Sequence, residues 1–217
     1  MEAVGRLSTA PVSAGRFEAL LRSLGAGRPA PDLFPSLAAA WAEPHRAYHG
    51  TRHLADCLEQ LDAAPADGAD RALVEAALWF HDAVYHPRAG DNEVRSAAWA
   101  ERALAGAGVP DERSAEIARL VLLTRHLAPA ADPAGRLLCD VDLSILGRSA
   151  ELYDGFERGI RAEYAWVPEP VYRAERSRIL SGLLARDPLY QTPHFQARYE
   201  SAAHDNLRRA LARLSSA

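Results

Sequence analysis

The stretch that decides the fold class is residues 51–63, which read TRHLADCLEQLDA. Leu54, Leu58 and Leu61 recur at intervals of four and three residues, a spacing that puts apolar side chains on one face of an α-helix. Thr51 stands at the start of the stretch and is a candidate N-cap. The pattern predicts an amphipathic helix over 51–63.

Most of the chain follows the same pattern. The 217 residues include 44 Ala and 25 Arg, both good helix formers, and no segment alternates as a half-buried strand would. We therefore expect an all-α fold, a single compact helical bundle of about eight to ten helices over residues 14–217, preceded by a flexible N-terminus at 1–13. Helices are predicted at 14–25, 33–42, 51–63, 70–85, 92–107, 111–127, 134–146, 149–165, 169–186 and 194–213. Further candidate N-caps are Asp70, Asp91 or Asn92, and Asp111, and candidate helix stops are Gly106 and Gly147.

Composition excludes several classes of function. All 25 basic residues are Arg, so neither a Lys Schiff base nor a phosphate-binding loop ending in Gly-Lys-Ser/Thr can form. The net charge of −4 argues against a partner that is a nucleic-acid duplex. Two cysteines make no disulfide framework, and no apolar run reaches the length of about 18 residues that a membrane span needs. With no signal-peptide pattern at the start, we expect a cytoplasmic protein without a membrane partner.

Histidines are concentrated in one part of the chain. Six of the eight lie between residues 45 and 126. His49 and His53 are four apart and share a face if the helix extends back to them. Because His is a common ligand for divalent metals, this clustering suggests a metal site.

Two apolar segments contain acidic groups that require partners if they are buried. Residues 78–85 read LWFHDAVY, where His81 and Asp82 could hold a cation between them. Residues 137–147 read LLCDVDLSILG, where Asp142 is expected to face inward. Each group taken alone is also compatible with an ordinary polar face or a structural ion pair.

The ordered set of His53, His81-Asp82 and Asp142 resembles the HD-domain superfamily of metal-dependent phosphohydrolases, whose signature is His, then His-Asp, then a distant Asp. More narrowly, the chain is similar to small bacterial proteins described as predicted metal-dependent HD phosphohydrolases. The similarity covers roughly residues 35 to 210 and is carried by EPHRAYH (43–49), FHDAVY (80–85), DNEVRSA (91–97), DVDLSILG (140–147) and IRAEY (160–164).

The resemblance implies an HD-domain bundle with one divalent metal ion (Mn, Fe, Co, Ni, Zn or Mg). Its ligands would be His53, His81, Asp82 and Asp142, with Asp140 as the alternative final ligand. The expected substrate is a small-molecule phosphate, a nucleotide or another small phosphate ester, attacked by a metal-activated water. A homodimer is compatible with the sequence.

The remaining site residues are assigned by role. Catalytic candidates are Asp82, Glu93 and His126, and candidate substrate contacts are Arg46, His49, Arg161 and Tyr164. Without Lys, only Arg, His and the metal can supply positive charge to a phosphoryl group.

The sequence is compatible with two alternatives. An HD-fold di-iron oxygenase would need further histidines between His81-Asp82 and Asp142, where only His86 and His126 occur. A non-catalytic sensor that binds a metal or a nucleotide would retain the same residues. The four tryptophans, at 41, 79, 99 and 166, are expected to be core anchors rather than a base-stacking platform.

Overall fold

Ten α-helices and one 3-10 helix make up the regular structure of residues 11–65 and 67–216, the part of the chain that the computed structural model describes, and this part contains no strand. The all-α expectation is confirmed. Of the flexible segment expected at 1–13, residues 1–10 lie outside the described residues. The elements are α1 (Ala14–Ser23), α2 (Leu33–Trp41), α3 (Thr51–Ala63), α4 (Arg71–Phe80), α5 (Asn92–Gly106), α6 (Asp111–Leu123), α7 (Pro133–Asp142), the 3-10 helix η1 (Leu143–Gly147), α8 (Ala150–Glu163), α9 (Glu169–Leu184) and α10 (Pro193–Ser215).

Local capping explains several helix starts. Asp70 caps α4, because its carboxylate accepts from two backbone N–H groups of the first turn. Two predicted caps are wrong by one residue: Thr51 and Asp111 are the first helical residues of α3 and α6, and the residue before each occupies the cap position. The helix stop expected at Gly106 is confirmed, since α5 ends at this residue, and Gly108 (φ 80°) is the left-handed residue that follows.

Three predicted helices end four or five residues earlier than expected. The helix predicted over 111–127 ends at Leu123, before the left-handed His126 (φ 51°). The helix predicted over 70–85 ends at Phe80, because Trp41 Nε1 donates to the Trp79 carbonyl and the Val84 N–H donates to Ser96 Oγ instead of continuing the helical hydrogen bonds. The helix predicted over 134–146 divides after Asp142, where the chain tightens into η1. The breaks after Phe80 and after Asp142 fall at candidate metal ligands.

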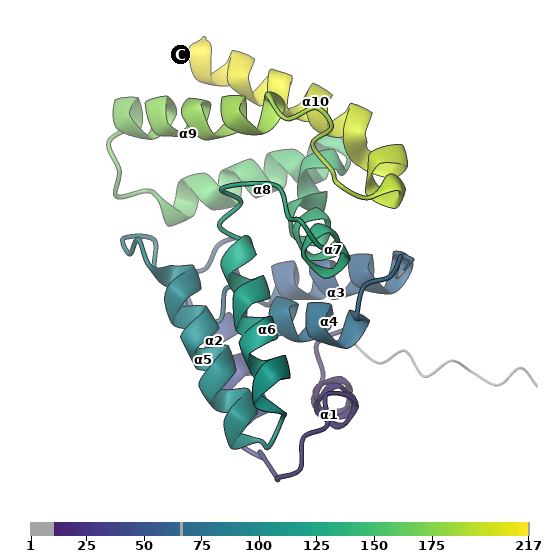
Figure 1. Ribbon diagram of the computed structural model, residues 1–217. Helices are drawn as coiled ribbons and strands as arrows, with labels where there is room; N and C mark the ends of the chain where they lie inside the picture. Colours follow the sequence, from purple (N-terminus) through teal and green to yellow (C-terminus); the bar gives the residue numbers. More distant parts are fainter. Residues whose placement is uncertain (1–10, 66, 217) are drawn as a thin grey trace, which may run out of the picture.

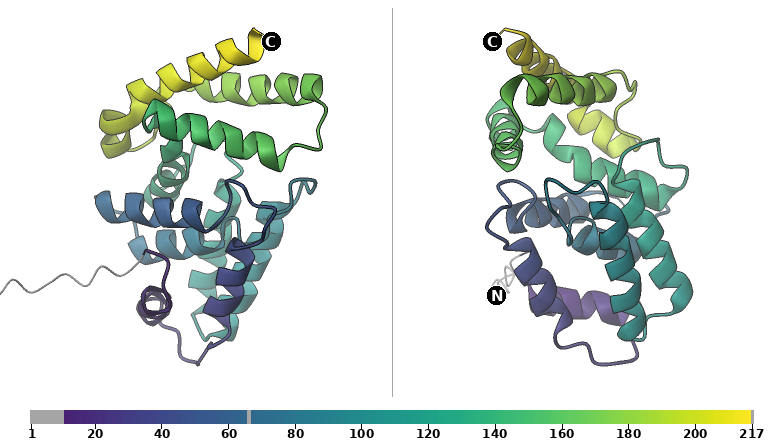
Figure 2. Two further views of the ribbon diagram at one scale, coloured as in Figure 1. Left: turned by 180° about the vertical axis from the view of Figure 1, so that it is seen from behind. Right: turned by 90° about the vertical axis from the view of Figure 1, so that its left-hand side faces the viewer.

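The helices form two groups, with α7 and η1 between them (Figures 1 and 2). On one side, α5 and α6 pair closely, and α4 packs against α6, α7 and α3. On the other side, α8, α9 and α10 lie together, and α10 contacts both η1 and α9. None of the described helices combines the length and apolar character needed to cross a bilayer.

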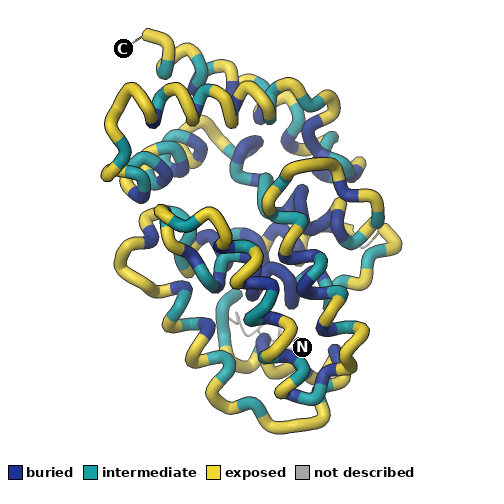
Figure 3. Tube along the Cα trace, turned by 60° about the vertical axis from the view of Figure 1, so that its left-hand side comes forward, coloured by how far each residue is buried: buried dark blue, intermediate teal, exposed yellow. Residues whose placement is uncertain are grey.

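Figure 3 shows the buried positions gathered between the helices. Leu54, Leu58 and Leu61, which define the predicted face of α3, are fully buried. Trp41 and Trp79 are core anchors as expected. The expectation is wrong for Trp166, which lies in the loop between α8 and α9 with 47% of its surface exposed.

Candidate metal centre

Three helix ends bring the candidate ligands together. His53 lies in the first turn of α3, on the face that also buries Cys57 and Leu61. His81 directly follows α4, and Asp142 is the last residue of α7. A carboxylate at a helix C-terminus opposes the helix dipole, so Asp142 requires positive charge nearby.

The side chains meet at short distances. His53 Nε2 lies 3.1 Å from His81 Nε2 and 3.2 Å from Asp142 Oδ1. His81 Nε2 lies 3.2 Å from Asp82 Oδ2 and 3.5 Å from Asp142 Oδ1. Both imidazoles are buried, and both carboxylates are almost buried. The structure thus places the four residues of the ordered motif in one cluster.

The orientation of His81 suits metal binding. Its Nδ1 lies 2.9 Å from the carbonyl oxygen of Leu78 and can only donate to it. In the neutral ring, this hydrogen bond leaves the lone pair of Nε2 facing His53 and the carboxylates.

The separations also fit a bound ion. Ligand atoms at about 2.1 Å from one ion lie about 3.0–3.4 Å from each other in right-angled or tetrahedral arrangements. The distances from His53 Nε2 to His81 and Asp142 fall in this range. Two groups of three side chains can therefore hold a metal ion, His53 with His81 and Asp82, and His53 with Cys57 and Asp142, each with ligand atoms within 4.8 Å of one another.

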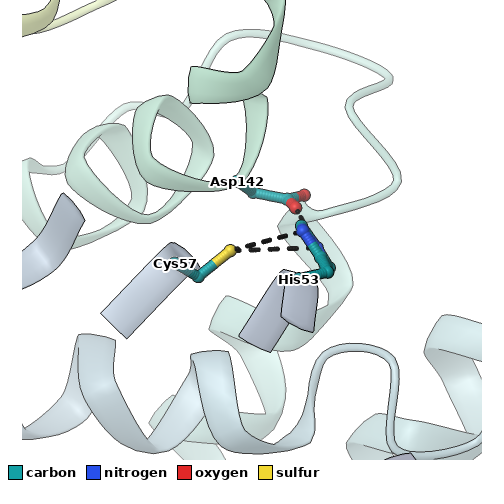
Figure 4. A group of neighbouring side chains, drawn as sticks. All are labelled: His53, Cys57 and Asp142. Atoms are coloured by element: carbon teal, nitrogen blue, oxygen red, sulfur yellow. Dashed lines mark hydrogen bonds and ion pairs between the residues drawn. The ribbon is translucent and has the colours of Figure 1, made fainter. Parts of the chain in front are cut away.

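Cys57 is a neighbour that the sequence pattern did not single out (Figure 4). Its Sγ lies 3.7 Å from Nδ1 and 3.8 Å from Nε2 of His53, so the thiol packs beside the ring between the two nitrogens. Burial raises the pKa of the Cys57 thiol well above its usual range, and Asp142 and Asp82 add to the shift. Cys57 is thus a neutral thiol next to the cluster.

Electrostatics favour positive charge at this point. Burial lowers the pKa of His81, but Asp82 and Asp142 raise it more strongly, so it stands well above its usual value. Burial likewise raises the pKa of Asp142, yet His81 and His126 hold it well below its usual value. The carboxylates therefore attract a positive charge that either a proton or a divalent cation can supply.

His126 joins the cluster from the loop after α6. Its Nε2 lies 2.8 Å from Asp142 Oδ2. Its backbone has φ 51°, a left-handed conformation that is uncommon outside Gly, and Arg186 donates to its carbonyl oxygen. The chain is thus held in a strained conformation that points this imidazole at Asp142.

Glu163 holds His49 and Tyr85 in position beside the cluster, and no pattern in the sequence indicated this role. The buried carboxylate accepts from the backbone N–H of Tyr48 and of His49, from His49 Nδ1 at 2.7 Å and from the Tyr85 hydroxyl at 2.7 Å. Burial raises its pKa, but these donors, His49 first, lower it from 4.5 to about 2. The segment IRAEY contains this residue, yet its partners lie more than seventy residues away in sequence.

Two of the expected substrate contacts are engaged elsewhere. The Arg46 guanidinium is buried and donates to Glu43 and to three backbone carbonyls, including that of Asp82. Arg161 pairs with Glu169 and donates to the carbonyls of Tyr164 and Val167. Arg46 thus holds the turn after α4 through the carbonyls of Asp82 and Ala83, outside the candidate site.

Asp140 points away from the cluster. Its carboxylate accepts from the backbone N–H of Gln191 and of Thr192 and from the Thr192 hydroxyl. Burial raises its pKa to about 6, although these hydrogen bonds act in the opposite direction. Between the two aspartates, the geometry brings Asp142 to the cluster.

A cleft of about 1110 Å³ opens above the cluster between the two groups of helices. The four motif residues line it together with His49, Glu93, His126 and Tyr164. Arg125 and Arg186 also line it and supply positive charge, whereas Arg176 is paired with Glu157. Arg46, Arg161 and His86 are absent from its lining.

No protein-family model, curated protein or solved structure matches this chain.

Proposed function

We propose that this protein is a metal-dependent phosphohydrolase of the HD type that cleaves a phosphate ester. The observation that carries the proposal is the convergence of His53, His81, Asp82 and Asp142 at the floor of a large cleft. Two imidazoles and two carboxylates are a donor set suited to Mn²⁺, Fe²⁺, Co²⁺, Ni²⁺ or Zn²⁺.

A metal ion held by these four residues would polarise a phosphoryl oxygen and lower the pKa of a bound water. The protein supplies the surroundings. Arg125 and Arg186 line the cleft on the side of His126, where guanidinium groups can neutralise phosphoryl oxygens. No Lys competes for this task.

We assign the holding and transfer of protons to two histidines. His49 uses Nδ1 on Glu163, which leaves Nε2 as its nitrogen for substrate or water. His126 holds Nε2 against Asp142. Glu93 lies in the first turn of α5 and lines the same cleft.

The test begins with protein stripped by a chelator and then loaded with one divalent metal at a time. Phosphate release is measured with p-nitrophenyl phosphate, bis-p-nitrophenyl phosphate and nucleoside mono-, di- and triphosphates. We expect Asp82→Ala to lower activity by about 100-fold or more and His81→Ala to lower bound metal per chain. Asp205→Ala, on the exposed face of α10, is the control and should leave both unchanged.

Three outcomes would contradict the proposal. Hydrolysis of no panel member with any metal would leave a binding protein, and an Asp82→Ala variant of unchanged activity would place the chemistry elsewhere. Two irons per chain together with oxygen uptake on a small organic substrate would favour an oxygenase.

A further inference from the structure

The exposed apolar side chains of this protein are unevenly distributed. Seven large apolar residues are exposed within residues 11–65 and 67–216. Four of them line the cleft above the candidate metal centre: Leu127, Trp166, Val171 and Ile179. Isolated exposed apolar groups are ordinary, but a group that surrounds one cavity marks a binding surface.

The apolar surface continues inward from this rim. Val171 and Ile179 lie two turns apart on α9, and Leu183 of the same helix also lines the cleft. Ile160 and Phe156 of α8 line it as well, as do Leu143, Ile145 and Leu146 of η1, which directly follows Asp142. An apolar path therefore runs from the rim to the metal ligands.

Polar groups of the lining are concentrated at the cluster, whose imidazoles and carboxylates form the floor of the cleft. The lining residues of α8 and α9 are mixed: charged side chains occur on α9, where Arg178 pairs with Glu175 and Arg176 pairs with Glu157. The remaining α8 and α9 lining residues are Gly182, Tyr172 and the apolar Phe156, Ile160, Val171, Ile179 and Leu183. Among the described lining residues, the one side-chain amide is Asn92, which accepts from the N–H of His86 and donates to its carbonyl oxygen. The described lining therefore offers no uncommitted side-chain amide for reading a nucleobase edge, and its other polar groups are histidines, tyrosines, Thr124 and charged side chains.

The size of the cleft points the same way. Its volume of about 1110 Å³ is at the upper limit of pockets that bury whole drug-sized molecules. A phosphoryl group at the floor would leave most of this space to the remainder of the substrate.

We infer that the substrate is a phosphate monoester with a long alkyl or acyl chain, the phosphoryl group at the metal cluster and the chain along α8 and α9. This inference rests on the proposed function, since that function places the phosphoryl group. Of the substrates expected from the sequence, a nucleotide or another small phosphate ester, it favours an amphiphilic ester over a nucleotide.

The test uses n-alkylphosphonates of four, six, eight and ten carbons, whose C–P bond resists hydrolysis, so that binding is measured without turnover. Calorimetric titration into the Mn²⁺-loaded chain should show Kd falling about two- to fourfold for each added methylene. Adenosine monophosphate, the comparison ligand, should bind more weakly than decylphosphonate.

Two variants test where the alkyl chain of the ligand binds. Val171→Asn and Ile179→Asn should reduce the dependence on chain length to less than about 1.5-fold per methylene, a loss expected when the apolar contact is removed. Val94→Asn is the matched control, because Val94 is 48% exposed against 53% for Val171 and does not line the cleft. All three side chains are solvent-exposed, and circular dichroism checks that the variants are folded.

The outcomes separate this inference from the proposed function. A Kd independent of chain length, or tighter binding of adenosine monophosphate, would overturn the inference even if metal-dependent hydrolysis is found. If no metal supports hydrolysis while Val171→Asn still abolishes the chain-length effect, the proposed function fails and the cleft remains a site for an alkyl anion. A Val171→Asn variant that converts a dimer to a monomer in light scattering, without any chain-length effect in the parent, would assign the rim to a second copy of the chain.

Discussion

Replacing Glu163 by Gln removes a buried negative charge that four donors surround, so the effect on stability should depend on pH. The carboxylate joins the end of α8 to the segment before α3 through Tyr48 and His49, and to the turn after α4 through Tyr85. Hydrogen bonds to charged groups each contribute about 1.5–3 kcal/mol. We expect Glu163→Gln to lower the free energy of unfolding by about 3 kcal/mol near pH 6.

The pKa shift sets the pH window. The carboxyl group has a pKa of about 2 in the folded protein and 4.5 ordinarily. A lowered folded pKa stabilises the protein above the ordinary value, and this contribution is lost as pH falls toward the folded value. The shift corresponds to about 3 kcal/mol in total, of which about 2 kcal/mol is lost by pH 3.

The assay is urea unfolding of both proteins, followed by circular dichroism between pH 6 and pH 3 with a chelator present. The difference in unfolding free energy between the parent and Glu163→Gln should shrink by about 2 kcal/mol over this range. Glu169→Gln removes an exposed partner of Arg161, and its difference from the parent should stay within about 0.5 kcal/mol at every pH. A gap for Glu163→Gln that is the same at pH 6 and pH 3 would refute the reasoning.

Three further predictions concern the metal centre, the packing of η1 against α10, and the turn that contains His81 and Asp82. Mn²⁺ at about 100 times its Kd should stabilise the parent by about 2.7 kcal/mol, and Asp142→Asn should lose most of this stabilisation in thermal unfolding; an equal gain in both proteins would remove Asp142 from the ligand set. Gly147→Ala should destabilise the protein by about 1–3 kcal/mol, because a Cβ there would lie 2.6 Å from a backbone oxygen of α10. The control Gly155→Ala should stabilise α8 slightly, because its Cβ would meet only the end of an Arg side chain. Urea unfolding compares the free energies of unfolding of the two variants. Arg46→Lys should cost about 2–4 kcal/mol, since one ammonium cannot satisfy the carbonyls that the guanidinium bonds, and Arg52→Lys on the exposed face of α3 should be neutral; equal midpoints in urea would contradict this.

Much of the helix pattern could be predicted because helix formation depends on nearby residues. Propensity, a spacing of three and four residues, and caps such as Asp70 act within a few positions of one another. The errors arose where distant groups intervene. The helix predicted over 70–85 ends at Phe80 because Trp41, thirty-eight residues before Trp79, takes the Trp79 carbonyl, and Ser96 takes the N–H of Val84.

The candidate site shows the same division. The residue types and order of His53, His81-Asp82 and Asp142 were visible in the sequence, since buried His and Asp in apolar segments require partners. Glu163 and Cys57 carried no such signal. Glu163 acts on His49 from 114 residues away, and Cys57 looked like an ordinary buried residue of α3.

The sequence by itself determined the all-α class, the lack of Lys chemistry and the set of side chains able to hold a metal, because composition and short-range spacing carry this information. Only the tertiary structure decided that Asp142 and not Asp140 faces the two imidazoles, and that Trp166 lines a cleft instead of the core. The reason is physical. Which way a side chain faces at the end of a helix depends on where that helix stops, and here distant hydrogen bonds and packing set the stops.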